Sequence, residues 1–348
     1  MIKIKDVNIG KGKPVFIIAE LSANHNQSFQ LAVETIHAMK EAGADAVKLQ
    51  TYTPDTITIN SRNELFMKKD GLWKGQSLYE LYQKAYTPWE WQPELKELAE
   101  KLGIVCFSSP FDKTAVDFLE EMDVPAYKIA SFEIVDIPLI EYVASKGKPV
   151  IMSTGVATLE DIELAIDTCR KADNNDIALL KCTSSYPAPY EEMNLKSIPF
   201  LKEKFGLPVG LSDHTMGIEI PVAAVALGAV IIEKHFILDK KLDTPDKAFS
   251  LDPTEFKQMV DAVRNVEKAL GEEGYLFTDK MSKARKNARS LFVVKDIKKG
   301  ELFTEENIRS IRPGAGLHPK YFSEILGKRA VEDIKKGTPL KWEHVSRK

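Results

Sequence analysis

Short apolar runs recur along this chain with helix-like stretches between them, and this alternation restricts the possible folds more than any other feature. Such a pattern is typical of βα units built around a parallel sheet. Eight runs can be counted, at residues 15–20, 46–50, 105–108, 126–130, 150–153, 178–182, 209–211 and 230–234. Eight units predict a closed β/α barrel of the TIM type. An open doubly wound sheet more often has a GxGxxG turn after an early strand, and the sequence contains none.

The stretches between the runs carry apolar residues at helical spacing or are rich in alanine. They predict helices over residues 31–41, 94–102, 114–121, 159–170 and 218–227. The connection from Tyr52 to Pro88 is far longer than a usual βα loop and is rich in aromatic residues. Long loops in compact domains are usually functional. This segment is therefore either a lid that contacts substrate or a short helix, near residues 78–85, packed on the barrel.

The length of 348 residues exceeds that of a usual single domain. The periodic pattern stops after Leu270, which predicts a barrel domain over residues 1–271, a charged linker over 272–284 and a small domain over 285–348. Within the small domain, Asp296–Gly300 recurs as Asp333–Gly337 with the same five-residue sequence. Two copies of one unit predict a pseudo-symmetric module, since a solenoid needs more repeats.

Composition excludes several classes of protein. The chain has 48 basic and 51 acidic side chains, so neither a nucleic-acid partner nor a membrane surface is indicated. The N-terminus has no signal-peptide pattern, and the longest apolar run, Ile220–Ile232, is too short to span a bilayer. Cys106, Cys169 and Cys182 are odd in number and lie in largely apolar segments, which is typical of reduced, buried thiols. We therefore expect a cytoplasmic protein without disulfides.

Polar residues at the ends of barrel strands are the candidates for chemistry. Lys48 and Lys128 lie within predicted strands, where burial of an ammonium group is costly unless an anion accompanies it. Side chains alternate along a strand, so Lys48 and Gln50 point the same way. Serines accompany the lysines at neighbouring strand ends, namely Ser109, Ser131 and Ser153. These groups would suit a phosphate and a carboxylate. The alternative is that the lysines form structural ion pairs with buried glutamates, namely Glu20, Glu133 or Glu233.

Two histidines, His214 and His235, fall at the ends of the seventh and eighth predicted strands. Their imidazoles could converge on one divalent ion and leave coordination positions open, as a Lewis-acid site requires. The alternative is a pair of hydrogen-bonded core histidines. His25, just after the first strand, is a weaker candidate for the same role.

Six motifs, in order along the chain, resemble the sialic acid synthase family. They are residues 18–25 (IAELSANH), 107–111 (FSSPF), 127–131 (YKIAS), 153–155 (STG), 210–215 (GLSDHT) and 233–236 (EKHF). The last segment, with residues 296–300 and 311–314, looks like the C-terminal antifreeze-like (SAF) domain of that family. Residues 50–55, 71–73, 78–82 and 182–187 are most similar to its pseudaminic acid synthase branch. Ser184 stands where synthases acting on N-acetylmannosamine carry Asn, and the shorter side chain could admit a doubly acetamidated sugar.

The resemblance implies condensation of phosphoenolpyruvate with 2,4-diacetamido-2,4,6-trideoxy-L-altrose and water, giving pseudaminic acid and phosphate. Synthesis of N-acetylneuraminate or legionaminate is the alternative within the family. The resemblance implies a divalent ion, Mn²⁺, Mg²⁺ or Co²⁺, on His214 and His235. It places phosphoenolpyruvate near Lys48, Ser109, Lys128, Ser131 and Ser153. It places the sugar near Glu20, Gln50, Ser184, Tyr186 and Asp246. Glu133 or the metal would assist removal of a proton from water. Arg312 is expected to reach the active site of the other subunit in a domain-swapped homodimer.

Two readings from other classes stay open at this point. A Schiff-base aldolase would use Lys128 or Lys181 to attack a ketone and would need no metal. A non-catalytic carbohydrate-binding protein is the second alternative. The density of polar groups at the strand ends argues against it, because an inert barrel has little reason to gather them there.

Overall fold

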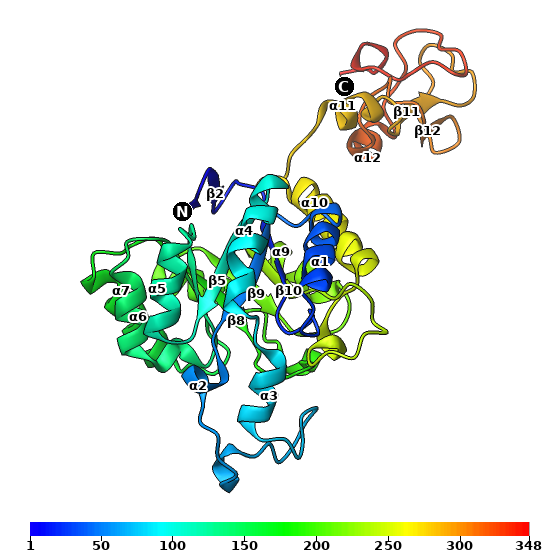
Figure 1. Cartoon of the computed structure of the whole chain (residues 1–348). Coiled ribbons are helices and arrows are strands. Elements are labelled where there is room, and N and C mark those ends of the chain that lie inside the picture. Colours follow the sequence, from blue (N-terminus) through cyan, green and yellow to red (C-terminus); the bar gives the residue numbers. More distant parts are fainter. Residues whose placement is uncertain (348) are drawn as a thin grey trace. The chain divides into compact units, whose positions relative to one another are not determined.

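The computed structural model describes residues 1–347 and divides the chain into two compact units, Met1–Gly271 and a second that begins at Glu272 (Figure 1). Eight parallel strands of the first unit close into a barrel in the order β10-β3-β4-β5-β6-β7-β8-β9. They are β3 (Phe16–Glu20), β4 (Ala46–Thr51), β5 (Val105–Pro110), β6 (Tyr127–Ile129), β7 (Val150–Ser153), β8 (Ile177–Cys182), β9 (Val209–Asp213) and β10 (Ile231–His235). Each strand overlaps one predicted apolar run, so the predicted TIM-type barrel is confirmed.

Helices follow the strands and surround the barrel (Figure 1). They are α1 (Phe29–Glu41), α2 (Pro54–Ile57), α3 (Leu78–Ala85), α4 (Gln92–Lys101), α5 (Lys113–Glu121), α6 (Ile137–Ala144), α7 (Leu159–Lys171), α8 (Ser197–Phe205), α9 (Glu219–Ala226) and α10 (Pro253–Leu270). Local sequence sets several of their starts. The side chains of Ser28, Asp112 and Thr158 accept hydrogen bonds from the first free amides of α1, α5 and α7.

Alternation along the strands divides the barrel interior into an apolar layer and a polar layer. Phe16, Ile18 and Ala46 belong to a buried apolar cluster near the starts of the strands. Lys48 lies two residues beyond Ala46 and therefore points to the same side, nearer the strand end. The barrel thus presents its charged groups at the C-terminal ends of the strands.

An N-terminal hairpin that the sequence patterns did not indicate covers the apolar layer. It consists of β1 (Ile2–Ile4) and β2 (Val7–Ile9), paired antiparallel. Ile2, Ile4 and Ile9 are buried in the same cluster as Phe16 and Ile18. The two strands follow each other directly, without a helix-like stretch between them, so they lack the βα alternation by which the barrel strands were recognised.

The second unit contains α11 (Asp279–Arg285), the antiparallel strands β11 (Ser290–Val293) and β12 (Ile308–Ile311), and α12 (Phe322–Ile325). The first of these elements begins within residues 272–284, which were predicted to be a linker. The side chain of Thr278 caps this short helix at its start, and the linker over residues 272–284 stays a prediction.

The repeated five-residue segments of the second unit are related by reciprocal contacts. Ile297 and Ile334 exchange two backbone hydrogen bonds, of 2.9 and 2.8 Å. Asp296 and Asp333 each accept a 2.9 Å hydrogen bond from a lysine of the other copy. The predicted pseudo-symmetric module is therefore confirmed.

All three cysteines are buried and unpaired. Within residues 1–347, no helix is both long enough and apolar enough to cross a membrane.

Candidate active site

A cavity of about 510 Å³ opens at the C-terminal ends of the barrel strands. Most of the predicted site residues line it, namely Lys48, Gln50, Lys128, Ser131, Glu133, Ser153, Ser184, Tyr186, His214, His235 and Asp246. Glu20 and Ser109 are not part of the lining, but both contact the ammonium group of Lys48. Arg312 belongs to the second unit.

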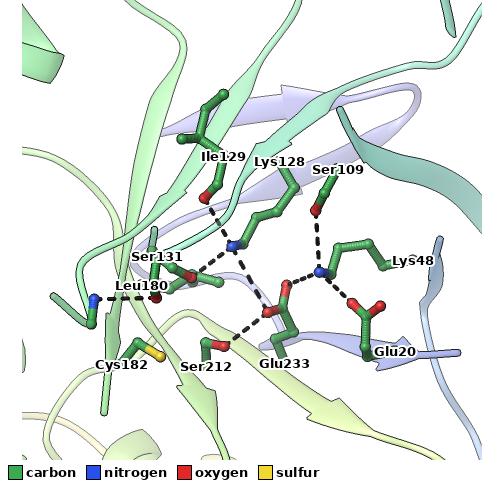
Figure 2. A network of polar contacts seen from close by, with 12 residues as sticks. Glu20, Lys48, Ser109, Lys128, Ile129, Ser131, Leu180, Cys182, Ser212 and Glu233 are labelled. Carbon is green, nitrogen blue, oxygen red and sulfur yellow. Dashed lines mark hydrogen bonds and ion pairs between the residues drawn. The ribbon is translucent and has the colours of Figure 1, made fainter. Parts of the chain in front are cut away.

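The two predicted lysines share one carboxylate, that of Glu233 (Figure 2). Lys48 Nζ forms an ion pair with Glu20 and lies 3.6 Å from Glu233 Oε2. Lys128 Nζ lies 3.9 Å from Glu233 Oε1, which also accepts a 2.9 Å hydrogen bond from Ser212. The ion pairs considered as an alternative are thus present for Glu20 and Glu233. Within residues 1–347, Glu133 forms no ion pair with either lysine, and its Oε2 is buried without a hydrogen-bond partner.

The two ammonium groups differ in how well they are compensated. Burial favours the neutral amine of Lys48, but Glu20 and Glu233 outweigh it and raise the pKa. Burial also lowers the pKa of Lys128, and there Glu233 offsets it only in part. An anion bound beside Lys128 would therefore stabilise its charged form. Such an environment favours a phosphate or a carboxylate ligand.

Three serine hydroxyls converge on the same wall of the cavity. Lys128 Nζ donates to Ser153 Oγ at 2.6 Å. The backbone amide of Gly155 donates to Ser131 Oγ at 3.3 Å. A Cβ atom at Gly155 would overlap the hydroxyls of both Ser131 and Ser184. Glycine at this position therefore allows the hydroxyls to approach each other, and its φ is not in the left-handed region.

Two imidazoles face each other beside these groups, with ring centroids of His214 and His235 5.2 Å apart. His214 Nδ1 lies 3.3 Å from the carbonyl oxygen of Thr183, which favours the proton on Nδ1 and a lone pair on Nε2. His235 Nδ1 is buried without a hydrogen-bond partner. These donors fit a divalent ion. Within residues 1–347, no three His, Cys, Asp or Glu residues are grouped to hold a metal, so water or substrate would complete the coordination.

A buried ion pair ties together the two segments that carry these histidines. Lys234 Nζ lies 2.5 Å from Asp213 Oδ2, and both side chains are fully buried. Lys234 also binds the carbonyl oxygen of Thr215, whose amide donates to Asp213 at 3.0 Å. Asp213 directly precedes His214, and Lys234 directly precedes His235. The pair therefore fixes the backbone next to each imidazole.

His25, the weaker candidate, does not line the cavity. Its ring contacts Trp91, and its Nε2 lies 3.3 Å from Thr87 Oγ1. Burial lowers the pKa of His25 to about 4. These contacts make it a neutral core histidine. Lys181 does not line this cavity either; its Nζ donates to the carbonyl oxygen of Cys182.

The long connection after β4 forms one wall of the cavity and contains the predicted short helix, α3. That this segment is a lid contacting substrate stays a prediction. Leu81 and Ala85 of α3 are buried. The indole ring of Trp73 lies 6.0 Å from the ring of Tyr186. The residues that this connection contributes to the lining are Tyr52, Ile57, Lys68, Trp73, Leu81, Tyr82 and Ala85.

Sequence reasoning did not select several other lining residues. Ser22, Ser212, Pro245 and Phe249 are among them. Alternation could have found Ser212, because it shares a strand end with His214. Pro245 and Phe249 lie in the connection after β10, where no periodic pattern marks them.

A family model matches this chain over residues 35–275, and it describes the NeuB family. The chain belongs to the NeuB family. A second family model, the SAF domain, matches residues 288–346, which confirms the predicted antifreeze-like domain. This NeuB family member therefore combines the catalytic barrel of the family with a C-terminal SAF domain.

Relatives of this NeuB protein confirm the predicted resemblance. The pseudaminic acid synthase of Campylobacter jejuni is 54% identical over 334 residues, which cover 96% of this chain and 97% of that protein. The pseudaminic acid synthase of Helicobacter pylori is 54% identical, with 96% and 99% covered. Among solved structures, spore coat polysaccharide biosynthesis protein SpsE of Bacillus subtilis is 38% identical, with 99% of both chains covered and a TM-score of 0.67.

Proposed function

We propose that this NeuB family member condenses phosphoenolpyruvate with 2,4-diacetamido-2,4,6-trideoxy-L-altrose and water, giving pseudaminic acid and phosphate. The observation that carries the proposal is the 54% identity to pseudaminic acid synthases over 96% of the chain. The cavity agrees with this reaction, because ammonium, hydroxyl and imidazole groups line it together at the C-terminal ends of the barrel strands.

Lys48 and Lys128 would bind the phosphate and carboxylate of phosphoenolpyruvate. Lys128 already donates to Ser153, and Lys48 lies 3.4 Å from Ser109 Oγ. The two hydroxyls could therefore donate hydrogen bonds to the same phosphate or carboxylate oxygens that the lysines bind. The ligand would compete with Glu233 for both ammonium groups. Because the charges stay in place throughout the reaction, the lysines would support turnover as well as binding.

The sugar would occupy the side of the cavity formed by Gln50, Ser184, Tyr186 and Asp246. Trp73 and Tyr186 together supply an aromatic surface there. His214 and His235 would hold a divalent metal ion, which would polarise the aldehyde oxygen and make C1 of the sugar electrophilic.

Carbon 3 of phosphoenolpyruvate then forms a bond to C1 of the aldehyde, whose oxygen takes up a proton and becomes a hydroxyl. Water adds at carbon 2 of phosphoenolpyruvate. The tetrahedral intermediate releases phosphate by cleavage of the C–O bond. Glu133 would accept the proton of this water. Two observations support this role: Glu133 lines the cavity, and burial raises its pKa to about 7, a value suited to a general base near neutral pH.

We further propose a domain-swapped homodimer in which Arg312 of the SAF domain serves the active site of the other subunit. Support for this arrangement comes from the family resemblance of residues 311–314. It stays a prediction. Mixed dimers of an Arg312→Ala variant and a Lys128→Ala variant would test it, since one intact cross-subunit site should restore activity.

The test of the reaction is an assay with phosphoenolpyruvate, Mn²⁺ and a panel of amino sugars. Phosphate release and product mass are measured for the diacetamido trideoxy altrose, for N-acetylmannosamine and for the precursor sugar of legionaminic acid. The first should turn over with the highest kcat/KM. Preferred use of another sugar would move the protein to a different branch of the family. Trapping of a substrate on Lys128 by borohydride, without a metal requirement, would instead indicate a Schiff-base aldolase.

A further inference from the structure

The connection between β10 and α10 contributes three residues to the cavity wall, namely Pro245, Asp246 and Phe249. The ring of Phe249 is buried, 4.8 Å from the ring of His235 and 5.1 Å from that of Tyr186. Their placement therefore decides the shape of the proposed sugar side of the site.

The backbone of this segment, residues 244–250, does little to fix itself. The amides of Lys247, Phe249 and Ser250 each lie 3.4 Å from their carbonyl acceptors within the segment. Hydrogen bonds at this distance are weak. The 244–250 loop must therefore be held by contacts from outside it.

Asn24 supplies such contacts from the segment that follows β3, the strand that pairs with β10. It is fully buried just after β3. Its Nδ2 donates to the hydroxyl of Ser250 at 2.8 Å and to the carbonyl oxygen of Phe236 at 2.9 Å. Its Oδ1 accepts from the hydroxyl of Thr244 at 2.6 Å. Both ends of the loop, and the residue that follows β10, are thus bound to one amide group.

These contacts lead directly to Asp246. The hydroxyl that accepts from Asn24, that of Ser250, donates in turn to the Asp246 carbonyl oxygen at 2.7 Å. The Asp246 carboxylate binds the hydroxyl of Ser22, which accepts from Gln50 at 3.1 Å. Asp246 is therefore bound through its carbonyl oxygen to Ser250, a partner of Asn24, and through its carboxylate to Ser22.

We propose that Asn24 is a positioning residue that binds both ends of the 244–250 loop and so holds Asp246 and Phe249 in the wall that receives the sugar. Asn24 does not line the cavity and acts through other residues. The inference rests on the proposed function for the identity of the substrate, whereas the placement of the loop is independent of it.

The test compares Asn24→Ala with the parent protein in two measurements. In steady-state kinetics, the KM for the sugar should rise by about tenfold, as expected when buried hydrogen bonds are lost, and the KM for phosphoenolpyruvate should change by less than about twofold. In hydrogen–deuterium exchange followed by mass spectrometry, peptides covering residues 237–252 should exchange about tenfold faster. Peptides from the barrel strands β6 to β8 should keep their exchange rates.

Asn174→Ala is a matched control. Asn174 is also buried, donates to the carbonyl oxygens of Lys148 at 2.8 Å and Ala144 at 3.3 Å, and accepts from the amide of Asp176 at 3.1 Å. It lies between α7 and the start of β8, at the opposite end of the barrel from the cavity. Its loss should lower the melting temperature to a similar extent but leave both KM values and exchange in residues 237–252 unchanged.

Equal behaviour of the two variants in sugar KM and loop exchange would refute the positioning role. If Asn24→Ala does not fold, Thr244→Val removes a single bond of the same set and is measured in the same way. It should give a smaller change confined to the loop, and no change would refute the proposal. If the parent protein turns over none of the sugars, the proposed function fails, while the exchange measurement still decides the role of Asn24.

Discussion

Replacement of Lys234 by methionine should destabilise the barrel far more than the loss of an exposed lysine. Lys234 and Asp213 are both fully buried, with 2.5 Å between Nζ and Oδ2. Methionine nearly matches the length of the lysine stem, so little volume is lost. What is lost is the charge opposite Asp213, together with the donor to the carbonyl oxygen of Thr215.

The magnitude follows from what remains around Asp213. The carboxylate keeps the amide of Thr215 at 3.0 Å and its hydroxyl at 3.1 Å, but no cation. Breaking a buried ion pair on one side costs about 3–5 kcal/mol, because an uncompensated charge is left in the interior. The double variant Asp213→Asn/Lys234→Met removes that charge as well. It should recover most of the loss, leaving about 1–2 kcal/mol for the missing hydrogen bonds.

Urea unfolding followed by far-ultraviolet circular dichroism measures these differences from the shift of the midpoint at constant slope. Lys257→Met is the control, since Lys257 forms an exposed pair with Asp261 on α10, 3.4 Å apart. Such a pair contributes about 0.5 kcal/mol or less. The reasoning is refuted if Lys234→Met costs no more than the control, or if the double variant is as unstable as the single one.

Three further predictions concern the cavity. His235→Ala should abolish Mn²⁺ binding, measured by electron paramagnetic resonance, while the melting temperature changes little; undiminished binding would remove His235 from the proposed metal site. Burial raises the pKa of Glu133 to about 7, so its base form accumulates only above that pH, and kcat/KM should fall as the pH drops below about 7. Glu133→Gln should lower kcat and remove this limb of the pH profile; an unchanged limb would assign it to another group. Gly155→Ala places a Cβ against the hydroxyls of Ser131 and Ser184, so it should raise the KM for both substrates and lower the free energy of unfolding by about 1–3 kcal/mol. Unchanged KM values would mean that the two serines move aside without affecting substrate binding.

The arrangement of charges bears on how substrate would enter. Glu233 bridges Lys48 and Lys128, so the two ammonium groups are already paired with a carboxylate that belongs to the protein. Because Glu233 is close to both, neither ammonium group is buried without a compensating negative charge. A ligand with its own phosphate and carboxylate would have to compete with Glu233, whereas a charge-neutral ligand could gain only hydrogen bonds from the two lysines, without a charge–charge attraction. The network thus favours dianionic or trianionic ligands over neutral sugars at this end of the cavity.

The sequence by itself determined the barrel and much of its lining, because periodic signals are local. An apolar run of three to six residues is recognisable wherever it lies, and each of the eight runs overlaps a barrel strand. Alternation also placed Lys48 and Gln50 on one side of β4 without any knowledge of their neighbours. The two histidines were found because each stands at a strand end.

Only the tertiary structure decided which of these groups meet. Closure of the barrel pairs β10 with β3 and so brings His235 beside Glu20, far away in the sequence. The tertiary structure also shows that two lysines share the carboxylate of Glu233 and that Asn24 binds both ends of the 244–250 loop. Such contacts leave no periodic trace, since they depend on distances between side chains that the chain brings together only when the sheet closes. For the same reason the N-terminal hairpin, whose strands have three residues each, became recognisable only from the apolar surface that it covers.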